Sequence, residues 1–209
     1  MRKRILVVAA LATALTGAIA GTAGAQSGPS VNFSLSSRLT CFDGTTDGGF
    51  YGLCSTKAGY AVLDNVTNDA TGATNPSDQY SGVYVKNNSV VGKAIGAVKA
   101  LGFSYIGTPT AGSPRISLGI DTNGGGAWDD FAFISAAQCN DGARTVDAIH
   151  DPTCTINLGS HTYDNWAALV AAHPEYRVGY TPFVIADDPG VWKLFNVNLG
   201  QGLLVGRNG

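Results

Sequence analysis

The stretch PRISLGIDTNGGGAWDDFAF, residues 114–133, decides the predicted fold. Ile116, Leu118 and Ile120 alternate with small or polar residues, which is the period-two pattern of a strand with one buried face. Phe131 and Phe133 begin a second apolar strand after a loop of Gly, Asn and Asp residues. The stretch therefore predicts a strand, a glycine-rich acidic loop and a returning strand.

Further short apolar segments, separated by turn residues, occur along the rest of the chain. We expect strands at residues 31–35, 60–63, 80–85, 101–105, 155–158, 183–186 and 191–199. Residues 163–173 have the apolar spacing of a helix, with Thr162 or Asp164 as the N-cap, and residues 87–100 stay undecided. This order predicts a mainly β fold: an antiparallel β-sandwich, jelly-roll-like, with one short helix.

The N-terminus has the features of an export signal. Three basic residues at positions 2–4 precede an apolar run, and small residues at 22–25 fit a signal peptidase site. We expect residues 1–25 to be a cleaved signal peptide and residues 26–209 to form a single secreted β-sandwich domain. No later stretch approaches the roughly 20 apolar residues that cross a bilayer, so we expect no membrane association after cleavage.

The exported chain is acidic. Removing the signal leaves 10 of the 13 basic residues against 15 acidic ones, a net charge of about −5. Nucleic-acid binding requires clustered Lys and Arg, and no basic run follows residue 4, so we expect no nucleic-acid partner.

The four cysteines, Cys41, Cys54, Cys139 and Cys154, all lie in the exported part. Four cysteines allow three pairings, and we favour the two local ones, Cys41–Cys54 and Cys139–Cys154. Each closes a short polar loop, the first containing a turn expected at residues 43–49. Loops of this length gain roughly 3 kcal/mol from a crosslink in the chain-entropy model.

Residues 114–126, the Phe131–Phe133 segment and the NWAAL run at 165–169 together resemble uncharacterised secreted β-sandwich proteins of actinobacteria. The similarity covers about residues 95–199. It implies a fold and a compartment and carries no catalytic signature.

The glycine-rich loop resembles the start of a calcium loop. Asp121, Asn123 and Asp129 occupy the first, third and ninth positions, and calcium requires six to eight oxygen ligands. The fifth position is Gly125 and the twelfth is Ala132, so the sequence leaves two hypotheses open. The loop either holds a weak calcium site or is a hairpin whose acids cap backbone amides.

Aromatic residues suggest a ligand surface. Trp128 lies at the tip of a glycine-rich loop, an unusual place for a side chain that seeks burial. Tyr80 and Tyr84 share one face of a strand and can extend a platform for sugar rings. Enzyme motifs are absent: the chain has no G-x-S-x-G, H-E-x-x-H or P-loop sequence.

The sequence thus predicts a secreted, non-catalytic module that binds glycans or other surface polymers, with calcium as an optional cofactor. One alternative is a glycoside-type hydrolase with an Asp-based site, for example Asp129 with Asp187 or Asp188. His150 beside Asp151 is interpreted as a surface histidine. The other alternative is a structural envelope or matrix protein.

Overall fold

The computed structural model describes residues 38–45, 53–57, 59–65, 79–86, 88–110, 112–139 and 144–200. They belong to one compact unit, Ser34–Gly209. The expected signal peptide at residues 1–25, the first expected strand at residues 31–35 and most of the expected turn at residues 43–49 lie outside the described residues.

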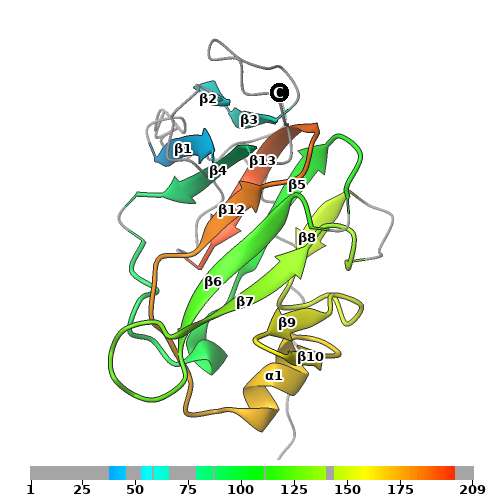
Figure 1. Ribbon diagram of the computed structural model, residues 1–209. Coiled ribbons are helices and arrows are strands. Elements are labelled where there is room, and N and C mark those ends of the chain that lie inside the picture. The colour runs from blue at the N-terminus through cyan, green and yellow to red at the C-terminus, as the bar shows by residue number, and fades with distance from the viewer. Residues whose placement is uncertain are drawn as a thin grey trace, which may run out of the picture. The chain divides into compact units, whose positions relative to one another are not determined.

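Two antiparallel sheets make up the fold (Figure 1). The strands of the larger sheet are β1 (Leu39–Thr45), β4 (Gln79–Val85), β6 (Arg115–Asp121), β7 (Asp130–Ser135), β9 (Ile156–Leu158), β10 (His161–Tyr163), β11 (Arg177–Val178) and β12 (Phe183–Ala186). In the described part of the chain these eight strands have the order β1-β4-β12-β6-β7-β9-β10, and β11 pairs with β6. The stretch that opened the sequence analysis is the β6–β7 hairpin, as predicted.

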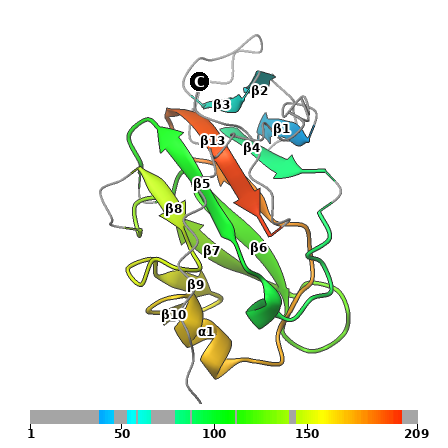
Figure 2. The same cartoon turned by 180° about the vertical axis from the view of Figure 1, so that it is seen from behind.

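The smaller sheet lies behind the larger one in Figure 1 and in front of it in Figure 2. Its strands are β2 (Cys54–Lys57), β3 (Tyr60–Asp64), β5 (Leu101–Ile106), β8 (Thr145–Asp147) and β13 (Val191–Leu199). Within the described residues their order is β2-β3-β13-β5-β8. The pairing of β13 with β5 shifts register between Phe195 and Asn198, which is a β-bulge.

The core fills the space between the sheets, because alternate residues of each strand point inward. Ile116, Leu118 and Ile120 of β6 are fully buried in one cluster with Leu194 of β13 and Phe103 of β5. Full burial of such a side chain contributes roughly 1.5–3 kcal/mol. The predicted antiparallel β-sandwich is therefore confirmed, whereas its jelly-roll topology is not confirmed by the observed strand orders.

Both predicted disulfides are present. Cys41–Cys54 connects β1 of the larger sheet to β2 of the smaller sheet, and Cys139–Cys154 connects the segment after β7 to the segment before β9. Disulfides of this kind are typical of proteins in an oxidising, extracellular environment. No helix in the described residues has the length and apolar character needed to cross a membrane.

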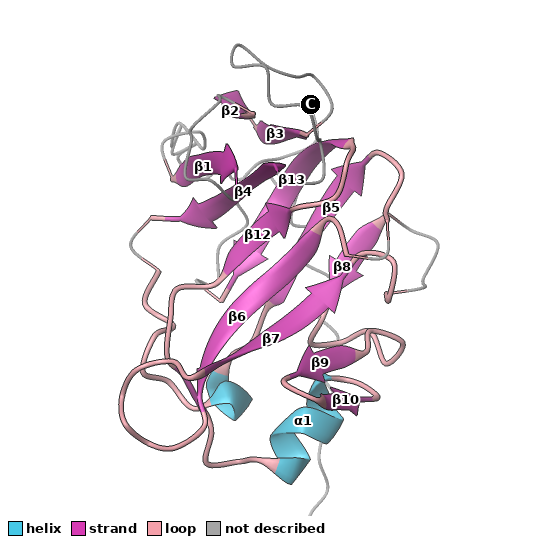
Figure 3. Ribbon diagram, viewed as in Figure 1, coloured by secondary structure: helices cyan, strands magenta, loops and turns pink. Residues whose placement is uncertain are grey.

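The helix α1 (Trp166–Ala172) is shorter than predicted (Figure 3). Residues 161–163 pair with β9 as β10, and the N-cap is Asn165, whose Oδ1 accepts a hydrogen bond from the Ala168 N–H. The Thr162 or Asp164 cap was therefore wrong.

Two further segments differ from the prediction or resolve it. The start of the turn expected at residues 43–49 is instead the end of β1, because its backbone pairs with β4. The undecided segment 87–100 contains a short 3-10 helix, Ile95–Ala97, and an isolated bridge from Ala94 to Arg177.

Candidate functional site

Aromatic side chains gather on the outer face of the larger sheet, which is the face turned away from the core. They come from four strands, from the β6–β7 loop and from the segment between β11 and β12. We call this set the aromatic face, and its members are Phe42, Tyr80, Tyr84, Trp128, Phe131, Phe133, Tyr180 and Phe183. Neighbouring ring centroids lie between 4.7 and 6.5 Å apart, so the rings form one continuous surface.

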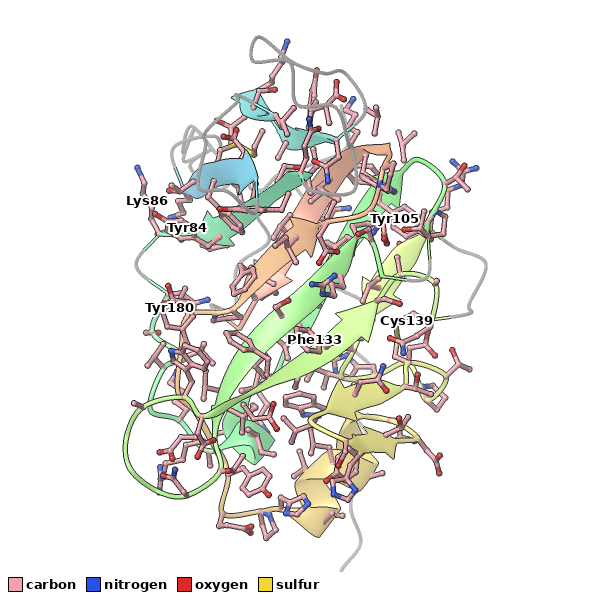
Figure 4. All side chains as sticks on the ribbon, in the orientation of Figure 1. Tyr84, Lys86, Tyr105, Phe133, Cys139 and Tyr180 are labelled. Carbon is pink, nitrogen blue, oxygen red and sulfur yellow. A yellow bond between two sulfur atoms is a disulfide. The ribbon has the colours of Figure 1, made fainter. Side chains whose placement is uncertain are left out.

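Strand alternation and register place these rings together. In β7, Phe131 and Phe133 point outward and stack on one another, while Ala132 between them is fully buried. Phe183 of β12 pairs directly with Tyr84 of β4, which brings two outward rings side by side across the strands. Tyr84, Tyr180 and Phe133 are labelled on this sheet in Figure 4.

Two glycines on the outer face make room for the rings. A Cβ added at Gly82 would lie 2.3 Å from Cζ of Phe42. A Cβ at Gly119 would lie 2.5 Å from Cβ of Tyr180 and 3.1 Å from Cβ of Trp128. Because these distances are shorter than van der Waals contact, only glycine lets the aromatic side chains lie flat against β4 and β6.

The rings enclose a groove of about 560 Å³, which is within the range of small-molecule sites. We call it the aromatic groove, and it is lined by Phe42, Tyr84, Trp128, Phe131, Tyr180, Thr181 and Phe183. None of these lining side chains is charged. The groove therefore suits an uncharged ligand.

The groove also presents polar groups. Tyr84, Tyr180 and Thr181 each carry a hydroxyl, and Trp128 carries an indole N–H. None of the four groups has a hydrogen-bond partner within the described residues. Trp128 and Tyr180 are about half exposed, at 47% and 48%. Their ring faces and polar edges are thus accessible to a ligand in solution.

The structure brings two of the three predicted ligand residues, Trp128 and Tyr84, into one groove. Tyr80 lies beside it, 6.5 Å from Phe42 between ring centroids. The sequence did not identify Phe131 as a lining residue, although its alternation with core positions in β7 carried the signal.

The β6–β7 loop positions Trp128. Asp121 is 3% exposed, and its two carboxylate oxygens accept backbone N–H groups from three loop glycines at 2.7 to 3.0 Å. Asp129 Oδ1 accepts the Thr122 N–H, and the Asp129 N–H donates to Ile120 O at 2.9 Å. These bonds fix the loop and hold the indole over the sheet.

The three expected calcium ligands therefore all bond to the loop itself. Asn123 Oδ1 accepts the Gly125 N–H at 2.7 Å, alongside the bonds of Asp121 and Asp129. In the described residues no group of three or more His, Cys, Asp or Glu side chains is arranged to hold a metal ion. Calcium binding stays a prediction, and the geometry corresponds to the hairpin hypothesis.

The aspartates considered for a hydrolase are not brought together. Asp187 forms a bidentate ion pair with Arg115 at the start of β6, and Asp188 accepts a hydrogen bond from Thr110 at 2.6 Å. Asp129 lies beyond the other end of β6. Seven strand residues separate these ends by roughly 20 Å, whereas a glycosidase pair lies about 5–10 Å apart.

His150 is exposed, as the sequence predicted. Its Nδ1 lies 3.0 Å from a carboxylate oxygen of Asp147 rather than near Asp151, which instead accepts bonds from Thr153.

Comparisons with known proteins found no match: no family model, curated protein or solved structure is similar to this chain.

Proposed function

We propose that this protein is a secreted module whose aromatic groove binds uncharged glycans without catalysing a reaction on them. The supporting observation is the groove itself, where aromatic faces and unpartnered polar groups lie together on an exposed sheet. A sugar ring presents the complementary surfaces, because its C–H faces are apolar and its edges carry hydroxyl groups.

The chemistry of the lining favours a glycan over two other occupants. An acidic or basic polymer requires charged partners, and no described residue that lines the groove is charged. A purely apolar ligand would leave the Tyr84, Tyr180 and Thr181 hydroxyls and the Trp128 N–H without partners once water is displaced, which costs free energy. A neutral sugar satisfies both the rings and the polar groups.

Preorganisation supports the same proposal. The hydrogen bonds of Asp121 and Asp129 fix the loop before a ligand arrives, so little conformational entropy is lost on binding. Tyr and Trp side chains have two rotatable side-chain bonds each, which keeps the cost of ordering them low.

The test is a glycan array of neutral and acidic polysaccharides, followed by calorimetry with an oligosaccharide hit. We expect binding to neutral glycans that changes little with salt, because no ion pair is formed. Trp128→Ala should weaken binding about tenfold or more, since truncating a central aromatic residue of an interface costs roughly 2 kcal/mol.

Ile106→Ala is the matched control. Ile106 is 51% exposed but lies on β5 of the other sheet, so removing it deletes a comparable exposed apolar side chain away from the groove. Tyr180→Phe keeps the ring and removes one hydroxyl, and should cost less than Trp128→Ala. Binding confined to acidic glycans, or equal affinity for wild type and Trp128→Ala, contradicts the proposal.

A further inference from the structure

A second cavity lies at the end of the larger sheet, beside α1. Its volume is about 360 Å³, and its lining includes Asp130, His161, Tyr163, His173 and Tyr176. Asp130 and Phe131 are consecutive in β7, so their side chains point to opposite faces of the sheet. The second cavity and the aromatic groove are therefore separate sites.

Three side chains at this cavity form a connected chain. Tyr163 Oη lies 2.7 Å from His173 Nε2, and His173 Nδ1 lies 3.5 Å from Glu175 Oε1. The Tyr176 ring stacks on the imidazole of His173, with centroids 4.2 Å apart and planes 5° apart. The imidazole thus has a hydroxyl on one nitrogen, a carboxylate near the other and an aromatic ring against its face.

Local structure explains how these residues meet. Tyr163 ends β10, which pairs with β9, and His173 is the C-cap of α1, followed by Pro174. The helix α1 therefore lies between Tyr163 and His173 in the sequence, and its C-terminal end places the His173 imidazole next to the Tyr163 hydroxyl. Pro174 cannot continue the helix, so the chain turns and brings Glu175 back to His173.

We infer that Tyr163, His173 and Glu175 form a nucleophile, base and orienting group that hydrolyse uncharged aryl esters in the second cavity. Tyr163 Oη lies within hydrogen-bond reach of His173, as a nucleophile and its base require, and the Glu175 carboxylate lies 3.5 Å from the other imidazole nitrogen. Tyr163 and His173 are among the residues that line the cavity, and Glu175 contacts His173 through Nδ1.

The chemical steps balance without another reagent. Tyr163 Oη attacks the ester carbonyl carbon while His173 Nε2 accepts the phenol proton, and collapse expels the leaving phenol, which takes that proton. Water then attacks the acyl-tyrosine while His173 accepts its proton, and the tyrosine oxygen leaves and recovers the proton. One ester and one water become one acid and one phenol.

The nucleophile restricts the substrate class. Acyl transfer to tyrosine is favourable only when the leaving group is about as acidic as a phenol, whose pKa is roughly 10, so aryl esters react and alkyl esters do not. The carboxylate of Asp130 faces the cavity and disfavours anionic esters.

Tyr176 also lines the second cavity, with its ring stacked on His173. Burial, followed by the nearby Tyr163, Glu175, Asp129 and Asp130, raises the pKa of the Tyr176 phenol above its ordinary value. The Tyr176 phenol is therefore protonated at neutral pH.

The probe is p-nitrophenyl acetate, hydrolysed by the oxidised full-length exported protein. Tyr163→Phe and His173→Gln should each lower the protein-dependent rate about a hundredfold, the usual contribution of a positioned base. Rapid acid quenching and peptide mapping should locate an acetyl group on Tyr163.

His150→Gln is the matched control, because His150 also lies beside a carboxylate but has no tyrosine partner among the residues that the structure describes. It should keep the full rate, and so should Ile106→Ala, which removes an exposed apolar side chain from the other sheet. Glu175→Gln should retain part of the rate with a shifted pH profile, as expected of a positioning residue.

Any one of three results overturns the inference. The rate is unchanged in Tyr163→Phe, the loss is equal in His150→Gln and His173→Gln, or the folded protein gives no rate above that of the unfolded protein. Tyr163→Phe removes one oxygen from a half-buried side chain, so it should fold. If His173→Gln melts early, the acetyl mapping in wild type decides alone, and acetylation elsewhere overturns the inference.

Discussion

Gly119 sits at the centre of the outer face of β6, a position where strands usually carry a side chain. Because Gly119 has no side chain, Tyr180 and Trp128 pack directly against its backbone. Gly82 allows the same packing for Phe42 on β4. At the scale of single residues, the shape of the groove therefore depends on two missing methyl groups as much as on the rings.

Gly119→Ala tests this directly. The new methyl group would lie 2.5 Å from Tyr180 Cβ, so Tyr180 and Trp128 must move. We expect a loss of about 1–3 kcal/mol in the free energy of unfolding, the usual cost of overpacking, and weaker glycan binding. Denaturant melts and calorimetry measure the two effects. Gly96→Ala is the control, since its methyl meets a single Val170 methyl at 3.1 Å, and equal effects of both changes would contradict the argument.

Among the elements, the β6–β7 loop has the densest set of side-chain to backbone bonds at the groove. Asp121→Ala removes the acceptor of three backbone N–H groups. Bonds to a charged acceptor are worth about 1.5–3 kcal/mol singly, so we expect a loss of at least about 2 kcal/mol in thermal melts. Asn123→Ala, which removes one bond from an exposed side chain, should cost less.

The same melts test calcium at this loop. A site of about 0.1 mM affinity would add roughly 1.4 kcal/mol of stability at 1 mM calcium, and magnesium should do less. This gain should disappear in Asp121→Ala. Coincident wild-type curves in calcium, magnesium and chelator would contradict calcium binding and leave the hairpin hypothesis.

Local patterns predicted the elements that depend on neighbouring residues. The alternation of Ile116, Leu118 and Ile120 predicted β6, and the apolar runs at residues 183–186 and 191–199 predicted β12 and β13. Short loops between cysteine pairs predicted both disulfides. In each case the signal lies within a few residues along the chain.

Features that depend on strand order could not be predicted. Phe42, Phe131 and Phe183 lie far apart in sequence and meet because β1, β4, β12, β6 and β7 are neighbours. β10 was missed for a related reason: residues 161–163 become a strand through pairing with β9, although Thr162 was predicted as a helix N-cap and Tyr163 as the first helical residue. The Tyr163–His173 contact likewise joins a strand to the end of a helix.

At the scale of the whole molecule, the two disulfides have different positions in the sandwich. Cys41–Cys54 joins the two sheets, whereas Cys139–Cys154 joins the segment after β7 to the segment that leads into β9 of the same sheet. Their sequence separations, 13 and 15 residues, are nearly the same. Chain entropy therefore predicts nearly equal stabilisation from both.

Replacing either cysteine pair by serine should lower the free energy of unfolding by about 3 kcal/mol, with the two variants within roughly 0.2 kcal/mol of each other. Denaturant melts at equal protein concentration measure this. A much larger loss for Cys41–Cys54 would show that holding the sheets together matters beyond loop closure. Free thiols in the native wild-type protein would contradict the pairing.

The three tryptophans differ sharply in their surroundings. Trp166 is 4% exposed and Trp192 is fully buried, with its indole N–H donating to Thr108 O, whereas Trp128 is 47% exposed in the groove. A water-soluble fluorescence quencher will therefore reach one indole of the three, and that indole is the one a bound glycan would cover. The protein thus carries its own optical reporter of ligand occupancy, which can be read without any label.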